Sequence, residues 1–153
     1  MINNDISIAE TTDLDDFKQL LHIFHEVFEM EDAVIPSDEH LRGILHTPTF
    51  NVLLAKVGER IVGGLTFHIL PQYYTPIPQV YLYDLGVTSS FQRRGIGSML
   101  IAALKDYCKK HGIEEFYVQA DQDDTQAVNF YRLTIPSREA DVLHFTYSDL
   151  LGS

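Results

Sequence analysis

A change of hydrophobic period between residues 80 and 110 constrains the fold of this chain more than any other feature. Residues 80–87 are a run of apolar and aromatic side chains broken by one acid and one glycine, which predicts a buried β-strand. From Gly97 to Lys110 the apolar side chains recur at helical spacing, and Gly112 follows as a stop signal. The chain therefore contains a strand, a short glycine-containing loop and a helix in direct succession.

The rest of the chain supplies further helices and strands. Apolar residues between Leu14 and Phe28 lie three or four positions apart, which predicts a helix that opens at Thr12 with Asp15 in a capping box. This pattern predicts an α/β fold with a mixed, mostly antiparallel sheet flanked by helices, in one domain over residues 1–153. The other expected elements are strands at residues 6–9, 50–57, 60–70, 115–119 and 142–146, and helices at residues 37–45 and 124–131.

Charge is distributed unevenly along the sequence. The 153 residues hold 22 acidic and 11 basic side chains, a formal net charge of −11. Nucleic-acid binding needs an excess of lysine and arginine, so a nucleic-acid partner is disfavoured. Five of the bases nevertheless lie within residues 92–110, beside a single acid. This arrangement indicates one site for an anion and another for a cation, although solubility alone also accounts for a net charge.

The remaining composition indicates a cytoplasmic protein. The single cysteine, Cys108, allows neither an intramolecular disulfide nor a thiolate zinc cluster. The first residues lack the regions of a signal peptide, and no apolar run approaches the roughly 20 residues of a membrane span. We therefore expect no membrane association and no metal site.

The loop Gln92-Arg-Arg-Gly-Ile-Gly97 has the properties of a phosphate site. The first turn of a helix offers free N–H groups and a partial positive charge, and glycine lets an anion approach the backbone closely. The alternative is a glycine turn that simply caps an ordinary helix. The loop lacks the GxxxxGK[ST] pattern and therefore is not a Walker motif.

The same loop resembles the acetyl-CoA-binding signature of the GCN5-related N-acetyltransferase (GNAT) superfamily. That signature is Gln/Arg-x-x-Gly-x-Gly/Ala after a strand, and Gln92, Gly95 and Gly97 match every fixed position. The resemblance implies acetyl-CoA as co-substrate, with its pyrophosphate on the loop and its pantetheine arm along the preceding strand. It assigns cofactor binding to nine residues: Leu85, Val87, Gln92, Arg93, Arg94, Gly95, Ile96, Gly97 and Ser98.

Three residues are candidates for catalysis. Asp84 is an acid within an apolar strand, where burial raises a carboxyl pKa towards that of a useful base; the alternative is a structural acid that pairs or caps. The resemblance implies that Tyr131 points at the sulfur of coenzyme A and assists its departure, whereas a core tyrosine is the alternative. His144, between Leu143 and Phe145, is either a packed residue or a secondary base.

Several strings resemble one GNAT subgroup, the small aminoglycoside 3-N-acetyltransferases. They include Tyr81-Leu-Tyr-Asp-Leu-Gly-Val87, Tyr117-Val-Gln-Ala-Asp121 and His144-Phe145. This resemblance implies direct acetyl transfer to a cationic aminoglycoside, and a homodimer. The role it implies is either antibiotic resistance or an ancestral metabolic reaction. The alternatives are a GNAT enzyme for a polyamine or a protein amine, and a non-catalytic acyl-CoA-binding module. Substrate contacts are expected at Glu26, Glu29, Tyr83, Asp121, Asp123 and Asp124.

Overall fold

The computed structural model describes residues 5–152, which form two compact units, one ending at Gln119 and one beginning at Ala120. Unit 1 is built on a five-stranded sheet in the order β1-β2-β3-β4-β5, with antiparallel pairing except between β4 and β5. This confirms the predicted α/β class and the mixed, mostly antiparallel sheet. Its elements are β1 Ile6–Thr11, α1 Leu14–Val27, α2 Asp38–Leu45, β2 Phe50–Val57, β3 Arg60–Leu70, β4 Gln79–Val87, the short 3-10 helix η2 Ser89–Phe91, α3 Ile96–Lys110 and β5 Phe116–Tyr117.

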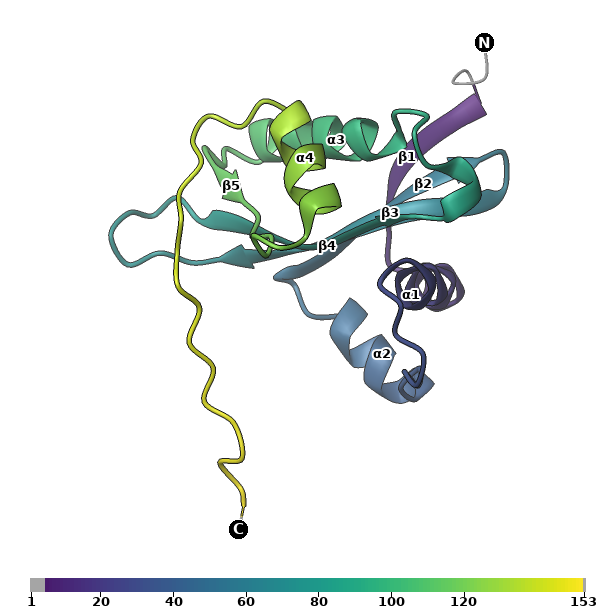
Figure 1. Cartoon of the computed structure of the whole chain (residues 1–153), viewed down its shortest axis with the longest axis horizontal. Helices are drawn as coiled ribbons and strands as arrows, with labels where there is room; N and C mark the ends of the chain where they lie inside the picture. Colours follow the sequence, from purple (N-terminus) through teal and green to yellow (C-terminus); the bar gives the residue numbers. More distant parts are fainter. Residues whose placement is uncertain (1–4, 153) are drawn as a thin grey trace. The chain divides into compact units, whose positions relative to one another are not determined.

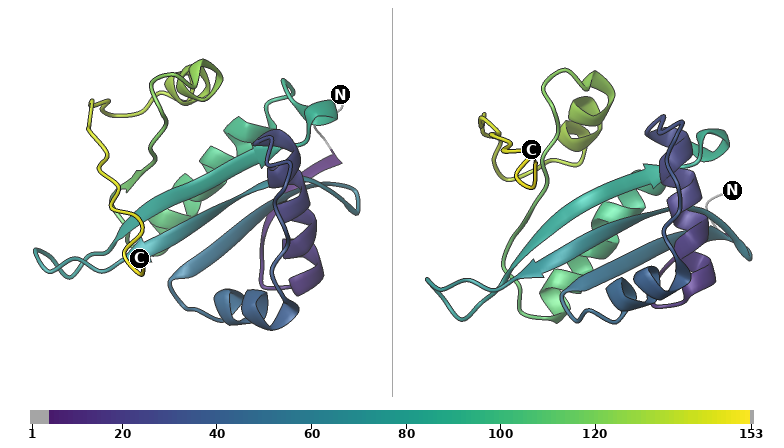
Figure 2. Two further views of the ribbon diagram at one scale, coloured as in Figure 1. Left: turned by 60° about the horizontal axis from the view of Figure 1, so that its bottom comes forward. Right: turned by 90° about the horizontal axis from the view of Figure 1, so that it is seen from below.

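Helices cover both faces of the sheet in unit 1. Figure 1 shows α1 and α2 on one side of the strands and α3 on the other, and Figure 2 shows the same layers from two further directions. On the α1 side, Val52 and Leu54 of β2 join Phe17 and Leu20 in a buried cluster. On the α3 side, Phe67 of β3 packs edge-on against Tyr107, with ring centroids 4.9 Å apart. Alternate residues of each strand therefore serve two separate cores.

Local capping explains where the helices begin. Asp13, not Thr12, is the N-cap of α1, because its carboxylate accepts the N–H of Asp16 at 2.9 Å. The expected capping box of Thr12 with Asp15 is therefore wrong by one residue. The expected helix from Ser37 is confirmed, since the Ser37 hydroxyl accepts the N–H of His40. Gly112, which follows the C-cap residue His111, adopts a φ of 69° and ends α3 as expected.

Unit 2 contains one helix, α4 Thr125–Leu133, and no strand among its described residues. The predicted strand at residues 142–146 is therefore wrong. Its alternating side chains favour an extended backbone, but a strand also needs a neighbour to pair with. No backbone–backbone hydrogen bond within the described chain involves residues 136–148. The prediction of one domain over residues 1–153 stays a prediction.

Two strand glycines let α1 approach the sheet. A Cβ on Gly64 would lie 2.6 Å from the carbonyl oxygen of Leu53 and 2.9 Å from Leu20 Cδ1. A Cβ on Gly86 would lie 3.0 Å from both Phe24 and Val27 of α1. The two glycines are paired across β3 and β4, so they form one flat patch beneath α1. The same patch sets how far α1 stands from the end of β4.

We predict that Gly64→Ala lowers the free energy of unfolding by about 1–3 kcal/mol, because the added methyl group overlaps backbone that cannot retreat. Gly43→Ala is the matched control, since a Cβ there meets nothing within 4 Å and lies inside α2. It is expected to raise stability by about 0.5–1 kcal/mol. Urea titrations of both variants measure the two changes, and equal effects would contradict the close packing at Gly64.

Candidate functional site

Strand β4 carries a bulge at Tyr83. Thr66 of β3 lies opposite Asp84, and the next residue, Phe67, lies opposite Leu82, so Tyr83 is the extra residue. A bulge lets two successive side chains lie on the same side of a sheet. Tyr83 contacts His68, and Asp84 lies level with Thr66. Tyr83 and Asp84 thus both lie on the face that α1 covers, close to one another.

Asp84 is a half-buried carboxyl without a partner. None of the described residues 5–152 forms a hydrogen bond or an ion pair with its carboxylate. Burial disfavours the charged form, so the pKa of Asp84 is raised above its ordinary value. An unpaired carboxyl in such surroundings is a better proton acceptor at neutral pH than an exposed one. Sequence reasoning expected the burial, but the bulge beside it was visible only in the structure.

A row of aromatic rings crosses the sheet next to this carboxyl. The ring of Tyr83 lies 5.6 Å from that of His68 and 5.7 Å from that of Tyr81, and Tyr81 stacks on Tyr117 at 4.8 Å. Tyr83 remains 57% exposed, so this expected substrate contact is accessible in unit 1. Flat aromatic faces of this kind suit the apolar faces of a ring-shaped ligand.

The pairing between β4 and β5 is short. β4 pairs with β5 only through Val80 and Tyr81. Among the described residues, no strand follows the β4 edge from Leu82 to Val87 on that side. The backbone N–H and C=O groups along this edge are available to an extended ligand, as they are at any open sheet edge, except the carbonyl of Val87, which accepts the amide N–H of Gln92. Leu85 and Val87, two expected cofactor contacts, lie on this stretch.

The loop after β4 forms a backbone cradle. Arg93 has a φ of 63° and Gly95 a φ of 82°, so left-handed residues alternate with an ordinary one. Such alternation turns successive N–H groups towards one concave side, which binds anions. Gly95 is the N-cap of α3 and provides no side-chain cap, which leaves the first N–H groups of the helix to a ligand. A left-handed arginine is uncommon, so this geometry is maintained against a conformational cost.

Side chains around the cradle hold it in shape. Gln92 donates its amide N–H to the carbonyl oxygen of Val87 at 2.9 Å. The carboxylate of Glu26, on α1, accepts the Thr88 hydroxyl at 3.0 Å and the backbone N–H of Ser89 at 3.2 Å. The Ser89 N–H and the Thr88 hydroxyl hold the pKa of Glu26 below its usual value. Gln92 and Glu26 therefore support the loop, a role that sequence reasoning did not assign to either.

Arg60 lies beside the loop after β4, a position that sequence reasoning did not predict. Its guanidinium carbon lies 5.0 Å from the centre of the Phe91 ring, and that of Arg94 lies 4.8 Å from the same ring. Neither arginine forms an ion pair with a described residue, although acids outnumber bases twofold. Arg60 and Arg94 thus place two positive charges on the ring of Phe91 without an acidic partner, and such a site suits an anion. Arg60 starts β3, far from the loop in sequence, so no local motif marks it.

The other expected residues lie mostly in unit 2. Asp124 is the N-cap of α4, where its carboxylate accepts the N–H of Ala127 at 3.1 Å. Tyr131 belongs to α4, and its carbonyl oxygen accepts the Thr134 hydroxyl. His144 lies in the exposed segment after α4. Three further expected substrate contacts are exposed: Glu29, directly after α1, and Asp121 and Asp123, before α4.

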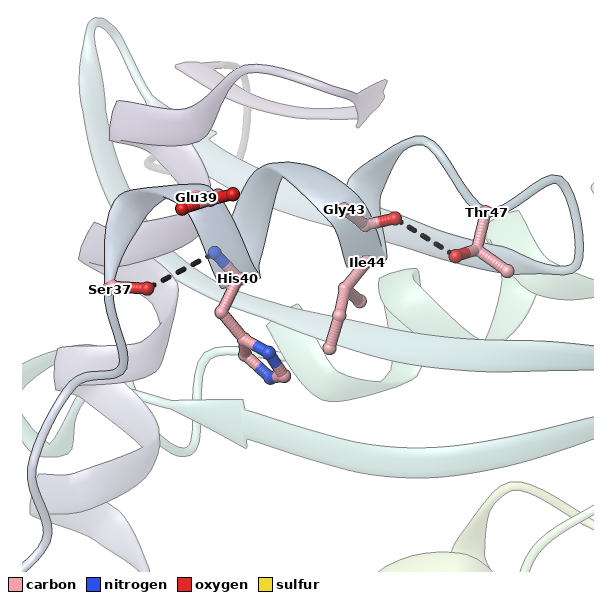
Figure 3. A pocket seen from close by; sticks show the side chains of 6 residues that line it. All are labelled: Ser37, Glu39, His40, Gly43, Ile44 and Thr47. Atoms are coloured by element: carbon pink, nitrogen blue, oxygen red, sulfur yellow. Dashed lines mark hydrogen bonds between the residues drawn. The ribbon is translucent and has the colours of Figure 1, made fainter.

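A separate depression of about 510 Å³ lies on α2 and carries no chemistry of its own (Figure 3). The Ser37 hydroxyl in it accepts the N–H of His40, and the Thr47 hydroxyl donates to the carbonyl of Gly43. These polar groups are thus occupied by the ends of α2 itself. None of the candidate catalytic residues lines this depression, so we do not regard it as the site.

Nucleophilic catalysis by the cysteine is also excluded. Cys108 is buried on α3, and burial raises the pKa of its thiol to about 11, so almost none is thiolate at neutral pH. Within residues 5–152, no three His, Cys, Asp or Glu side chains lie close enough together to hold a metal ion. None of the helices described over that range is long and apolar enough to cross a membrane.

Comparison with known proteins identifies this architecture. The sequence profile of the acetyltransferase (GNAT) family matches residues 16–134. The chain belongs to this family and is an acetyltransferase, with acetyl-CoA as the acetyl donor. The resemblance seen in the loop at residues 92–97 is therefore confirmed. The backbone cradle, the open β4 edge and the unpaired arginines fit the phosphates and the extended arm of that donor.

Two solved proteins resemble most of the chain. An aminoglycoside acetyltransferase, meta-AAC0020, from an uncultured soil metagenomic sample and in complex with sisomicin, is 43% identical with a TM-score of 0.95. The match covers 97% of this chain and 99% of that one. A second, HMB0005, from an uncultured soil metagenomic sample, is 30% identical over 94% of this chain and 97% of its own, with a TM-score of 0.84.

A curated relative matches only in part. The mycothiol acetyltransferase of Corynebacterium glutamicum (strain R) is 30% identical over 81 residues, which are 53% of this chain but 26% of the relative. The chain thus matches about a quarter of the length of that protein.

Proposed function

We propose that this protein transfers the acetyl group of acetyl-CoA to an amine of an aminoglycoside, at the 3-amino group, and so confers antibiotic resistance. The observation that carries the substrate class is the 43% identity, over nearly the full length of both chains, to an aminoglycoside acetyltransferase in complex with sisomicin. The regiochemistry rests on the subgroup resemblance of the strings in β4 and around residue 117. Cytoplasmic location and a homodimer belong to the same proposal.

The charge of the chain supports a cationic acceptor. Outside residues 92–110 the sequence has 21 acids and 6 bases, so most of the molecule attracts ammonium groups. Carboxylates bind ammonium groups through charge-assisted hydrogen bonds. Glu29, Asp121 and Asp123 are exposed, and each can serve in this way. Glu26 is the exception, because Thr88 and Ser89 already engage its carboxylate.

The donor would be held by the backbone. The pyrophosphate fits the N–H groups around Gly95 and Gly97, and the pantetheine arm fits the free edge of β4 at Leu85 and Val87. Ile96 is buried, so its backbone rather than its side chain would face the phosphates, whereas Arg93 and Ser98 are exposed. We add Arg60 to this set, because with Arg94 it brings two cations to Phe91, directly before the loop.

The proposed reaction is a direct transfer with both substrates bound. Bound acetyl-CoA supplies an activated acetyl group as a thioester. Asp84, directly or through a water molecule, accepts a proton from the ammonium group, and the amine so formed attacks the carbonyl carbon of the thioester. Backbone N–H groups of Leu85 to Val87 stabilise the developing negative charge on the acetyl oxygen. Tyr131 donates a proton to the departing sulfur, and His144 is a secondary base.

The decisive experiment for the function is a panel of acceptors. Thiol release from acetyl-CoA should occur with sisomicin and related aminoglycosides and be much slower with spermidine, peptides and N-terminal amines. Product mass and NMR identify the acetylated nitrogen. Release with spermidine alone would favour the polyamine alternative. No release at all, with acetyl-CoA still raising Tm, would favour a non-catalytic acyl-CoA-binding module.

Asp84→Asn is expected to lower kcat about 10²–10⁴-fold, the usual contribution of a general base, while leaving the Kd for acetyl-CoA unchanged. In the parent protein kcat/KM falls as the pH drops through the raised pKa of Asp84, because the protonated acid cannot accept a proton. The variant lacks this acidic limb. An unchanged pH profile would remove Asp84 from the mechanism.

The unfolding temperature of Asp84→Asn shows whether its lower kcat reflects lost catalysis or a misfolded protein. An acid whose pKa is raised on folding destabilises the native state once it ionises. Asp84→Asn should therefore unfold at a higher temperature than the parent at neutral pH, and the difference should vanish as the pH falls below the ordinary aspartate pKa. Asp106→Asn, on the exposed side of α3, is the control for loss of one carboxylate.

Arg60→Gln is expected to raise the Kd for coenzyme A about fivefold to tenfold, since it removes one of two cations facing the phosphates. The effect should shrink at high salt, because the arginine is exposed. Arg42→Gln on α2 makes the same change of charge away from the loop and should leave the Kd unaltered. Calorimetric titration measures both, and equal values for the two variants would exclude Arg60 from the donor site.

A further inference from the structure

The carboxylate of Glu26 is bonded to the chain directly after β4, although this side chain lies at the surface. Its Oε1 accepts the hydroxyl of Thr88 at 3.0 Å, and the backbone N–H and the hydroxyl of Ser89 at 3.2 Å and 3.3 Å. Its Oε2 lies 3.4 Å from the same Thr88 hydroxyl. An exposed carboxylate can satisfy itself with water, so several bonds to one short stretch of chain indicate that this stretch is being held in place.

These bonds cap the 3-10 helix η2 from outside. Thr88 is the N-cap residue of η2, and its side chain makes no cap hydrogen bond there. The Thr88 hydroxyl donates instead to Glu26, and the Ser89 N–H at the start of η2 donates to the same carboxylate. The first N–H groups of a helix need an acceptor from outside the helix. Helix α1 therefore supplies, through Glu26, the cap that the loop after β4 lacks.

The helix η2 ends at Phe91, whose ring carries two arginines. The N–H of Phe91 donates to the carbonyl oxygen of Thr88 at 2.9 Å, and the N–H of Thr88 donates to that of Val62 at 2.8 Å. Val62 lies two residues after Arg60 on β3. The guanidinium groups of Arg60 and Arg94 meet on the Phe91 ring. A shift of η2 would thus move the ring relative to Arg60.

The charge of Glu26 acts against the anion that this loop is expected to bind. The Ser89 N–H and the Thr88 hydroxyl hold the pKa of Glu26 below its usual value, so the carboxylate is ionised at neutral pH. A negative charge near the cradle repels phosphates. Capping and charge therefore affect donor binding in opposite directions, and variants that change one without the other separate them.

We propose that Glu26 is a positioning residue of the donor site: it caps η2, holds the ring of Phe91 and so places the two arginines on that ring to receive the phosphates of acetyl-CoA. The inference rests on the donor site proposed above and is independent of which amine accepts the acetyl group. It replaces the substrate contact expected at Glu26, because the carboxylate that would bind an ammonium group is already engaged by the start of η2.

Two conservative variants separate the cap from the charge. Glu26→Gln removes the charge but keeps an acceptor oxygen at the same reach, whereas Glu26→Asp keeps the charge on a side chain one methylene shorter. In calorimetric titrations with coenzyme A, Glu26→Asp should raise the Kd about fivefold, the size expected for a lost cap, while Glu26→Gln should stay close to the parent. A Glu26→Asp variant as tight as the parent, or a Glu26→Gln variant as weak as Glu26→Asp, would overturn the proposal.

A double-mutant cycle tests whether Glu26 acts through the arginines. If it does, Glu26→Asp and Arg60→Gln together should raise the Kd by less than the product of the two single effects. Effects that multiply, as from a general loosening of the fold, would overturn the positioning role alone. An Arg60→Gln variant that binds coenzyme A like the parent would overturn the donor site, and this inference with it.

Glu31→Gln is the matched control for the loss of a nearby carboxylate. Glu31 is exposed in the segment after α1, and its side chain forms no hydrogen bond or ion pair with another residue of the described chain. This variant should bind coenzyme A like the parent, with circular dichroism confirming that all variants fold. A Kd raised as far as in Glu26→Asp would show that the place of the carboxylate does not matter, and the proposal would be wrong.

Discussion

The incomplete pairing of β4 determines most of what this molecule can do. The strand is bonded to β3 along its whole length but to β5 at only two positions, Val80 and Tyr81. Unpaired backbone at a sheet edge is a liability unless something covers it. Here the free edge runs directly into the loop that cradles an anion, so one continuous backbone surface can bind a long ligand that carries phosphates at one end. Family membership identifies that ligand as acetyl-CoA.

Contacts around the free edge of β4 fix the position of α1 and of the loop that follows the strand. Gly64 and Gly86 bring α1 onto the sheet, and Glu26 of α1 then reaches Thr88 and Ser89 beyond the strand end. Gln92 returns from the loop to the carbonyl of Val87. These interactions occupy side chains that could otherwise bind ligands. The acid on α1 nearest the loop is therefore structural, whereas Asp84, the carboxyl proposed for catalysis, has no such partner among the described residues.

The sequence was informative where the signal is local. Hairpin strands at residues 50–57 and 60–70, the helix after the glycine loop and its stop at Gly112 follow from period and turn residues, and all are confirmed. The loop itself was recognisable because a left-handed position needs glycine, as at Gly95. The bulge at Tyr83 and the contact of Arg60 with Phe91 escaped notice, since each depends on which strands are neighbours.

The strand predicted at residues 142–146 is wrong for a related reason. Alternation predicts that a segment can be a strand, whereas pairing depends on a second backbone, and within the described chain that backbone is absent. In unit 1 the same kind of pattern has such a neighbour, since β2 and β3 pair along most of their length. Hydrophobic period therefore predicts which segments can be strands, and a hydrogen-bonded neighbour decides which of them are.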